Sequence, residues 1–274
     1  MHKGNLSDNV VLLVSHERSG STHFLRSICS ASLIKSAGDV LNYHKHDKDD
    51  PLSYYGFRSR WLAANKVPES PLDDVLFPLL DAYFEQAVSA MDRERTIFDI
   101  KYAHVHALSG FWFSPSSGSL LLKYALLRKI PVIHLYRRSV FAAVSSMHLA
   151  IARDIWNAQN IDHVDQHKIT LDRESMSLQL ADLALQSAAY QHFARRIGAL
   201  SISYEDLVSK LRCDNIFEQV AAHLNIRWKG RPQSGLVKVS GAPENYISNY
   251  SDIADLAQIY ADIDVHNPIR LRVN

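Results

Sequence analysis

Apolar residues follow two patterns along this chain: short continuous runs, and longer segments in which they recur at helical spacing. Continuous β-branched or leucine-rich runs are typical of strands that are buried on both faces. Segments with helical spacing are typical of helices that bury one side. The predicted strands cover residues 10–14, 96–100, 132–136 and 200–204, and the predicted helices cover 22–34, 58–65, 72–91, 120–129, 139–156, 173–197, 215–224 and 253–263.

The alternation of strands and helices predicts the fold class. Such βαβ units give parallel strands, with helices covering both faces of the sheet. We therefore expect an α/β protein with a P-loop-like, three-layer fold, in which a central parallel sheet is flanked by helices. No repeat or break in composition divides the 274 residues, so we expect a single domain over 1–274. Ligands of such folds bind at the carboxyl ends of the strands.

The composition narrows the possible partners and the compartment. The net charge is +1, so no general attraction to nucleic acid or to an acidic membrane is expected. The two cysteines, Cys29 and Cys213, form no CxxC pair, and the first residues carry no apolar leader. These features predict a cytoplasmic protein. No apolar stretch approaches ~18 residues, so no membrane span is expected.

Histidine is abundant, with 14 residues, and two HxH pairs stand at 44/46 and 104/106. An HxH pair can chelate a metal from a strand. No third ligand follows at a diagnostic spacing, and no HExxH pattern is present. Scattered surface and core histidines are therefore the favoured interpretation, and no metal is expected.

A loop of charge, hydroxyls and one glycine, HERSGST, follows the first predicted strand and precedes a predicted helix. The unpaired N–H groups and the dipole at a helix start favour an anion. Gly20 permits close backbone approach, Arg18 can bind an oxyanion with two hydrogen bonds, and Ser19, Ser21 and Thr22 offer hydroxyls. An ordinary Ser/Thr cap is the alternative. The GxxxxGK[ST] pattern is absent, so the loop predicts a phosphate site without triphosphate machinery.

A second strand end carries a similar combination, in the segment VIHLYRRSVFAAVSS. Arg137 follows the predicted strand, and Ser145 stands eight residues later, two turns into the next helix. Together they can hold a phosphate monoester. Arg138 with Ser146 is the shifted alternative, and a surface charge at a helix start is the third interpretation.

These motifs resemble those of sulfotransferases that use 3′-phosphoadenosine 5′-phosphosulfate (PAPS). RSGST is similar to the 5′-phosphosulfate loop of the bacterial carbohydrate and nodulation-factor members, and the Arg137 segment is similar to the family's 3′-phosphate site. FDIKYAH resembles the family's GxKxxW/Y strand, which implies that Lys101 lies near the transferred group. ISYEDLV resembles the YEDL segment, which implies that Tyr204 lies near the adenine, although a plain helix start also fits. The segment NYISNYSDI resembles the region that closes over the cofactor, with Lys238 as a phosphate contact.

The resemblance implies transfer of a sulfuryl group from PAPS to a hydroxyl or amine of a small-molecule, carbohydrate or lipid-linked acceptor, with PAP as the product and no metal. Arg18 and the loop N–H groups would stabilise the leaving 5′-phosphate, and Lys101 would assist at the sulfuryl oxygens. An ATP-dependent small-molecule kinase of related P-loop fold is the alternative enzyme, since TIFDI could mimic a Walker B strand that ends in Asp99. A non-catalytic nucleotide-binding module is the alternative outside enzymes.

The resemblance implies that the catalytic base lies after the first helix, in the stretch SAGDVLNYH, where the bacterial members of the family carry acids. Asp39 stands at the first acid's place, while Asn42 stands at the place of the second. Asp39 is therefore the candidate base, with His104 and His44 as alternatives whose ordinary pKa suits the role. A turn residue at the end of the helix is an equally compatible interpretation of Asp39.

Insertions at about 42–70 and 156–172 are expected to bind the acceptor. Aromatic residues in the first insertion can stack on sugar faces, but a small satellite core is the favoured alternative. They are Tyr43, Tyr54, Tyr55, Phe57 and Trp61.

Overall fold

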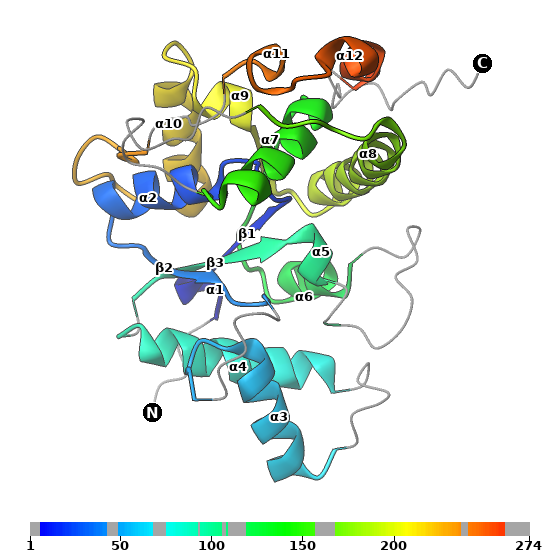
Figure 1. The fold of residues 1–274 in the computed structure, drawn as a ribbon. Helices are drawn as coiled ribbons and strands as arrows, with labels where there is room; N and C mark the ends of the chain where they lie inside the picture. The colour runs from blue at the N-terminus through cyan, green and yellow to red at the C-terminus, as the bar shows by residue number, and fades with distance from the viewer. Residues whose placement is uncertain are drawn as a thin grey trace.

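The computed structural model describes residues 6–42, 49–67, 75–92, 94–105, 108, 119–156, 168–236 and 241–260. Five parallel strands form one sheet in the order β2-β3-β1-β4-β5 (Figure 1). The strands are β1 (Val10–Ser15), β2 (Lys35–Asp39), β3 (Thr96–Lys101), β4 (Val132–Tyr136) and β5 (Leu200–Ser203). The described helices are α1 (Leu6–Asn9), α2 (Ser21–Ala31), α3 (Tyr54–Asn65), α4 (Leu76–Ala90), α5 (Tyr102–Val105), α6 (Leu120–Leu127), α7 (Val140–Arg153), α8 (Arg173–Arg196), α9 (Tyr204–Leu207), α10 (Cys213–Leu224), α11 (Pro243–Tyr246) and α12 (Tyr250–Ile259).

β1 runs through the middle of the sheet, and all six of its residues are buried. Val10, Leu12 and Val14 belong to one apolar cluster, while Val11 and Leu13 belong to another on the opposite face. Helices α2 and α10 cover the second face, and α4, α6 and the end of α8 cover the first (Figure 1). Burial on both faces explains why this strand is continuously apolar. The predicted three-layer α/β fold is confirmed.

A third apolar cluster joins α7 and the first half of α8 to α11 and α12. Tyr246 and Ile247 belong to it, and Ile169 forms an isolated parallel bridge with Ile247. This cluster fixes α7, which follows directly on the end of β4. α11 and α12 are thereby packed against α7, and α12 also packs against α8. None of the described helices is both long enough and apolar enough to cross a membrane.

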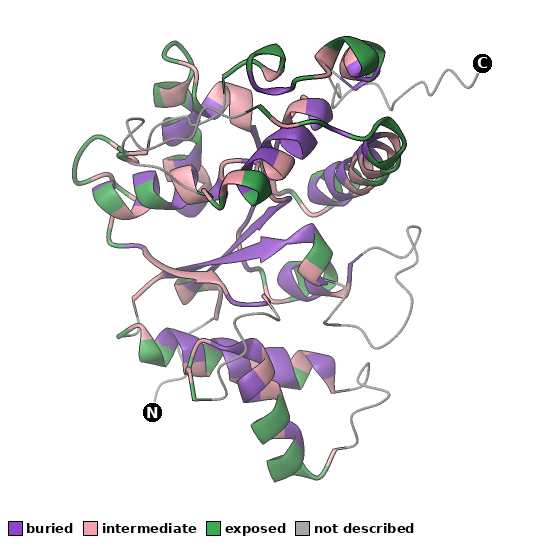
Figure 2. Ribbon diagram, in the orientation of Figure 1, coloured by how far each residue is buried: buried purple, intermediate pink, exposed green. Residues whose placement is uncertain are grey.

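β2 is a strand that the hydrophobic pattern did not predict. Its sequence, KSAGD, has no β-branched residue, and it is half-buried at the edge of the sheet (Figure 2). The register with β3 shifts between Ser36 and Gly38, and Gly38 has a φ of 72°. Such a bulge re-aims the side chain that follows, which is Asp39. The interpretation of Asp39 as a helix-end turn residue is wrong, because α2 ends at Ala31.

The aromatic residues of the first insertion pack mainly into the core. α3 begins at Tyr54, earlier than predicted, and Tyr54 and Phe57 are buried in the same cluster as Tyr83 of α4. Tyr55 and Trp61 are partly buried against that cluster. These four residues therefore serve the core, as the alternative to sugar stacking predicted, but the cluster is the large one that includes β1 and β3 and not a small satellite. Tyr43 lies outside the described residues. Figure 2 shows that the far end of α3 is exposed.

Candidate functional site

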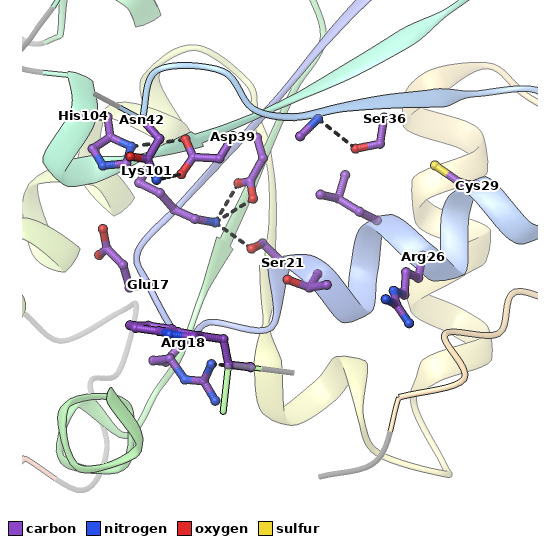
Figure 3. A pocket seen from close by; sticks show the side chains of 15 residues that line it. Glu17, Arg18, Ser21, Arg26, Cys29, Ser36, Asp39, Asn42, Lys101 and His104 are labelled. Atoms are coloured by element: carbon purple, nitrogen blue, oxygen red, sulfur yellow. Dashed lines mark hydrogen bonds and ion pairs between the residues drawn. The ribbon is translucent and has the colours of Figure 1, made fainter. Parts of the chain in front are cut away.

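A pocket of about 800 Å³ opens at the carboxyl ends of β1, β2 and β3 (Figure 3). The loop after β1 and one side of α2 form part of its wall, and the ends of β2 and β3 form the facing part. Its charged lining residues are Glu17, Arg18, Arg26, Asp39, Asp99, Lys101 and His104. The pocket therefore lies where an α/β sheet binds its ligands.

The loop between β1 and α2 has an unusual backbone. Arg18 and Gly20 have φ values of 61° and 86°, in the left-handed region. Gly20 is the N-cap of α2 and no side chain caps the helix, so the ordinary Ser/Thr cap is not what the sequence builds. The Ser19 hydroxyl is buried and donates to the His16 carbonyl at 2.7 Å. The start of α2 therefore presents backbone N–H groups that suit an anion.

His16 joins this loop to the end of β4. Its Nδ1 donates to the Glu17 carbonyl at 2.6 Å, and its Nε2 accepts the Arg137 backbone N–H at 3.1 Å. Burial lowers the pKa of His16 to about 4, so the ring is neutral, as an accepting Nε2 requires. The ring of His16 therefore links the loop to the end of the neighbouring strand.

Arg137 and Arg138 point to different surroundings. Arg137 is nearly buried, and its guanidinium lies 4.8 Å from the centre of the Tyr204 ring. Its Nη1 donates to the Arg18 carbonyl at 3.4 Å. Arg138 pairs with Glu205 and Asp206, and Arg137 shares Glu205, whose Oε1 lies 3.9 Å from Arg137 Nε. Arg137 is thus the arginine that borders the loop, as the preferred register predicts.

Arg18 extends from the loop toward α7. Its Nε donates to the Ser146 hydroxyl at 3.2 Å, and its Nη1 donates to the Trp156 carbonyl at 2.7 Å. Burial and the nearby Arg137 lower the pKa of Arg18. Two cations therefore crowd one side of the loop, and a bound anion would relieve their repulsion.

Ser145 is fully buried and its hydroxyl is engaged within the protein. It donates to the Phe141 carbonyl at 2.8 Å and shares a hydrogen bond of 2.9 Å with the Tyr246 hydroxyl. Ser146, from the shifted alternative, is the serine that contacts Arg18. Beside the loop, the structure therefore places Arg137, from the preferred register, and Ser146, from the shifted alternative.

Lys101 connects the end of β3 to the start of α2. Its Nζ donates to both carboxylate oxygens of Asp99, at 2.8 and 2.7 Å, and to the Ser21 hydroxyl at 2.6 Å (Figure 3). A further hydrogen bond of 3.0 Å reaches Ser15. A buried cation is therefore fixed at the boundary between the loop and the pocket.

Asp39 and His104 form a hydrogen-bonded pair across the pocket wall. His104 Nδ1 donates to Asp39 Oδ1 at 3.1 Å, and Asn42 Nδ2 donates to Asp39 Oδ2 at 3.4 Å (Figure 3). The hydrogen bond with Asp39 raises the pKa of His104. Since Nδ1 is engaged, Nε2 is the ring atom left to exchange a proton with a ligand.

No model of a known protein family matches the chain, and no curated protein matches its sequence. Function is therefore inferred from the geometry of the site and from the motifs.

The structure brings most of the predicted residues to one loop. Those that line the pocket are Arg18, Ser21, Thr22, Asp39 and Lys101. Those beside β4 and β5 are Arg137, Ser145 and Tyr204. Lys238 and His44 lie outside the described residues. Within the described ranges, no group of three or more His, Cys, Asp or Glu side chains is arranged to hold a metal ion.

Sequence reasoning missed three residues at the site: His16, Glu17 and Tyr246. His16 and Glu17 directly follow a buried strand, and this position was the only signal that they offered. Trp156, the first residue of the second predicted insertion, does line the pocket. Tyr246 stands in the C-terminal segment whose resemblance pointed instead to Lys238.

Proposed function

We propose that this protein is a sulfotransferase that moves a sulfuryl group from PAPS to a hydroxyl or amine of a small-molecule, carbohydrate or lipid-linked acceptor. The observation that supports this most is the closeness of two arginines from separate strand ends. Arg137 Nη1 lies 3.4 Å from the carbonyl oxygen of Arg18. Two cations, one on the loop after β1 and one beside it after β4, suit a nucleotide with phosphate groups at two positions.

The residues around the loop fit a nucleotide of this kind. The uncapped start of α2 offers N–H groups to a 5′-phosphate. Arg137 Nε is buried without a hydrogen-bond partner, and a phosphate oxygen would satisfy it. The Tyr204 ring, which lies against Arg137, offers a flat surface close by for a base.

The side chains of the pocket supply what an in-line transfer needs. PAPS, when bound, supplies the sulfuryl group and retains the electron pair of the broken sulfur–oxygen bond as PAP. Arg18 stabilises the charge that develops on the 5′-phosphate, and Lys101 stabilises the sulfuryl oxygens. His104 takes the proton of the acceptor hydroxyl at Nε2 as the new sulfur–oxygen bond forms. Asp39 orients the ring and favours its protonated form.

The contacts between Asp99 and Lys101 at the end of β3 support this proposal over the kinase alternative. A kinase would use an acid there to hold Mg²⁺, and Asp99 occupies that place. Both Asp99 carboxylate oxygens instead accept hydrogen bonds from Lys101, and one also accepts from Ser15 at 3.4 Å. A lysine fixed in this way suits an anionic group in transfer.

The proposal includes a cytoplasmic location, which the two free cysteines support. Neither Cys29 nor Cys213 forms a disulfide, as is usual in a reducing compartment. It also keeps the whole chain, 1–274, as one functional unit.

Transfer of labelled sulfuryl groups from PAPS to a panel of hydroxyl and amine acceptors, without Mg²⁺, tests the proposal. We expect PAP release that rises with pH through the raised pKa of His104, because the neutral ring is the base. Asp39→Asn removes the carboxylate, so the acid limb of the profile should shift to lower pH while turnover falls.

Two outcomes would count against it. Phosphate transfer from ATP with Mg²⁺, and none of sulfate, would favour the kinase. Tight PAP binding with no transfer to any acceptor would favour the non-catalytic module.

A further inference from the structure

Glu17 places a carboxylate in the pocket, one residue before Arg18. Its side chain is partly exposed and extends from the loop toward His104 (Figure 3). Neither a hydrogen bond nor an ion pair links this carboxylate to any residue that the structure describes. It faces the same space as the pair that we propose as the base.

The other acids of the pocket already have partners. Asp99 is bound by Lys101, and Asp39 is bound by His104. Arg18, the nearest cation in the sequence, is turned to the Ser146 hydroxyl and the Trp156 carbonyl. Among the described pocket residues, Glu17 is therefore the carboxylate that has neither a hydrogen bond nor an ion pair, although its charge helps to raise the pKa of His104.

An unpaired carboxylate at this position opposes the binding of an anionic donor. Like charges in a partly buried site repel each other strongly. A cation brought by the second substrate would lie between the two anions and be attracted by both. Trp156 also lines this pocket, where the Arg18 guanidinium lies 5.9 Å from the centre of its ring. An aromatic ring adds favourable contact with a sugar face.

We propose that the acceptor carries a protonated amine, which Glu17 binds, and that it belongs to the amino sugars. The hydroxyl that receives the sulfuryl group then lies toward His104. This inference rests on the proposed function, because it concerns the acceptor of the same reaction. Glu17 acts here as a specificity residue: it attracts the cationic acceptor and disfavours neutral or anionic ones.

NMR titrations with D-glucosamine and D-glucose test the proposal, because these sugars differ by an ammonium group in place of one hydroxyl. They are made on the full chain, with and without PAP, at mildly acidic pH. We expect glucosamine to bind about tenfold more tightly or better, the usual value of a charged hydrogen bond. Glu17→Gln should remove this preference. Arg26→Gln should keep it, because Arg26 stands on α2 in the same pocket and is not the group that binds the amine.

Equal affinity for the two sugars, including no binding of either, would overturn the inference, and so would a preference that survives in Glu17→Gln. Turnover adds a second criterion. Because the Glu17 charge helps to raise the pKa of His104, Glu17→Gln should shift the acid limb of the kcat profile to lower pH and also raise KM for the amine. An unchanged KM for the amine would overturn the inference. Failure of PAP to bind in the same samples would contradict the proposed function alone, because the sugar preference is measured without PAP as well.

Discussion

The ring of Tyr204 lies against Gly20, on the side where any other residue would carry a Cβ. A Cβ built there would stand 2.5 Å from the ring, far inside contact distance. Gly20 also has a φ of 86°, which residues with a side chain adopt at a cost. Two separate physical causes therefore favour glycine at position 20: the backbone conformation and the packing of the Tyr204 ring.

Gly20→Ala should lower the free energy of unfolding by more than the ~1–2 kcal/mol that a left-handed backbone costs an alanine. The excess comes from displacing Tyr204. Urea denaturation measures it, and Gly198→Ala is the matched control. Gly198 has a φ of 69° but nothing within 4 Å of its built Cβ. Its alanine variant should therefore lose stability through the backbone conformation alone.

The double variant Gly20→Ala with Tyr204→Ala separates the two contributions. Removing the ring should recover the excess, so the two losses should not add. Equal losses for Gly20→Ala and Gly198→Ala would show that the ring contact contributes nothing.

At the residue scale, the sequence indicated which side chains belong to the site, but not which other side chains they contact. Arg18 and Lys101 were expected near the reacting atoms, and both line the pocket. The hydrogen bond between Asp39 and His104 was not foreseeable, because Asp39 ends β2, a strand that was not predicted, and His104 lies far away in the sequence, in α5. Glu17 gave no signal, since an acid beside an anion site belongs to no motif.

At the scale of elements, His16 links the ends of β1 and β4. Its ring is buried and neutral, and it accepts the backbone N–H of Arg137. His134, within β4, is also buried, and burial lowers its pKa to about 3. Both rings gain protons more readily in the unfolded chain, where the ordinary pKa is 6.5.

The free energy of unfolding should therefore fall as pH is lowered from 6.5 toward 4. Because the folded pKa of His16 is the lower one, its contribution is complete above the unfolded pKa and is lost as pH falls through this window. For His16 the full effect is about 3 kcal/mol. Denaturation at several pH values measures it, and His16→Gln should flatten the slope. An unchanged slope in that variant would contradict the role of His16.

The central strands were predicted because burial on two faces leaves them largely apolar: continuously in β1, and with one polar interruption each in β3, at Asp99, and in β4, at His134. β2 was not predicted, because an edge strand needs no such run and the KSAGD sequence has no strand-forming side chains. Its pairing with β3 is a long-range contact, which local pattern cannot show. The position of Asp39 in the pocket was therefore expected only from the resemblance.

At the scale of the whole molecule, the strand order explains the site. β1 lies between β3 and β4, so the cations at their carboxyl ends meet: Arg18 after β1, Lys101 on β3 and Arg137 after β4. A net charge of +1 conceals this local concentration. The sequence predicted each of these ends separately, and the sheet brings them to one loop.

Calorimetric titration of the protein with PAP is the most direct test of the central claim, that two arginines from different strand ends bind one doubly phosphorylated adenosine. We expect PAP to bind without Mg²⁺ and more tightly than ATP with Mg²⁺. Arg18→Ala with Arg137→Ala should abolish this binding, since each charged contact is worth about tenfold or more. Arg138→Ala, the control that faces Glu205 and Asp206, should retain it. Absence of PAP binding, or equal binding by the double variant, would contradict the claim.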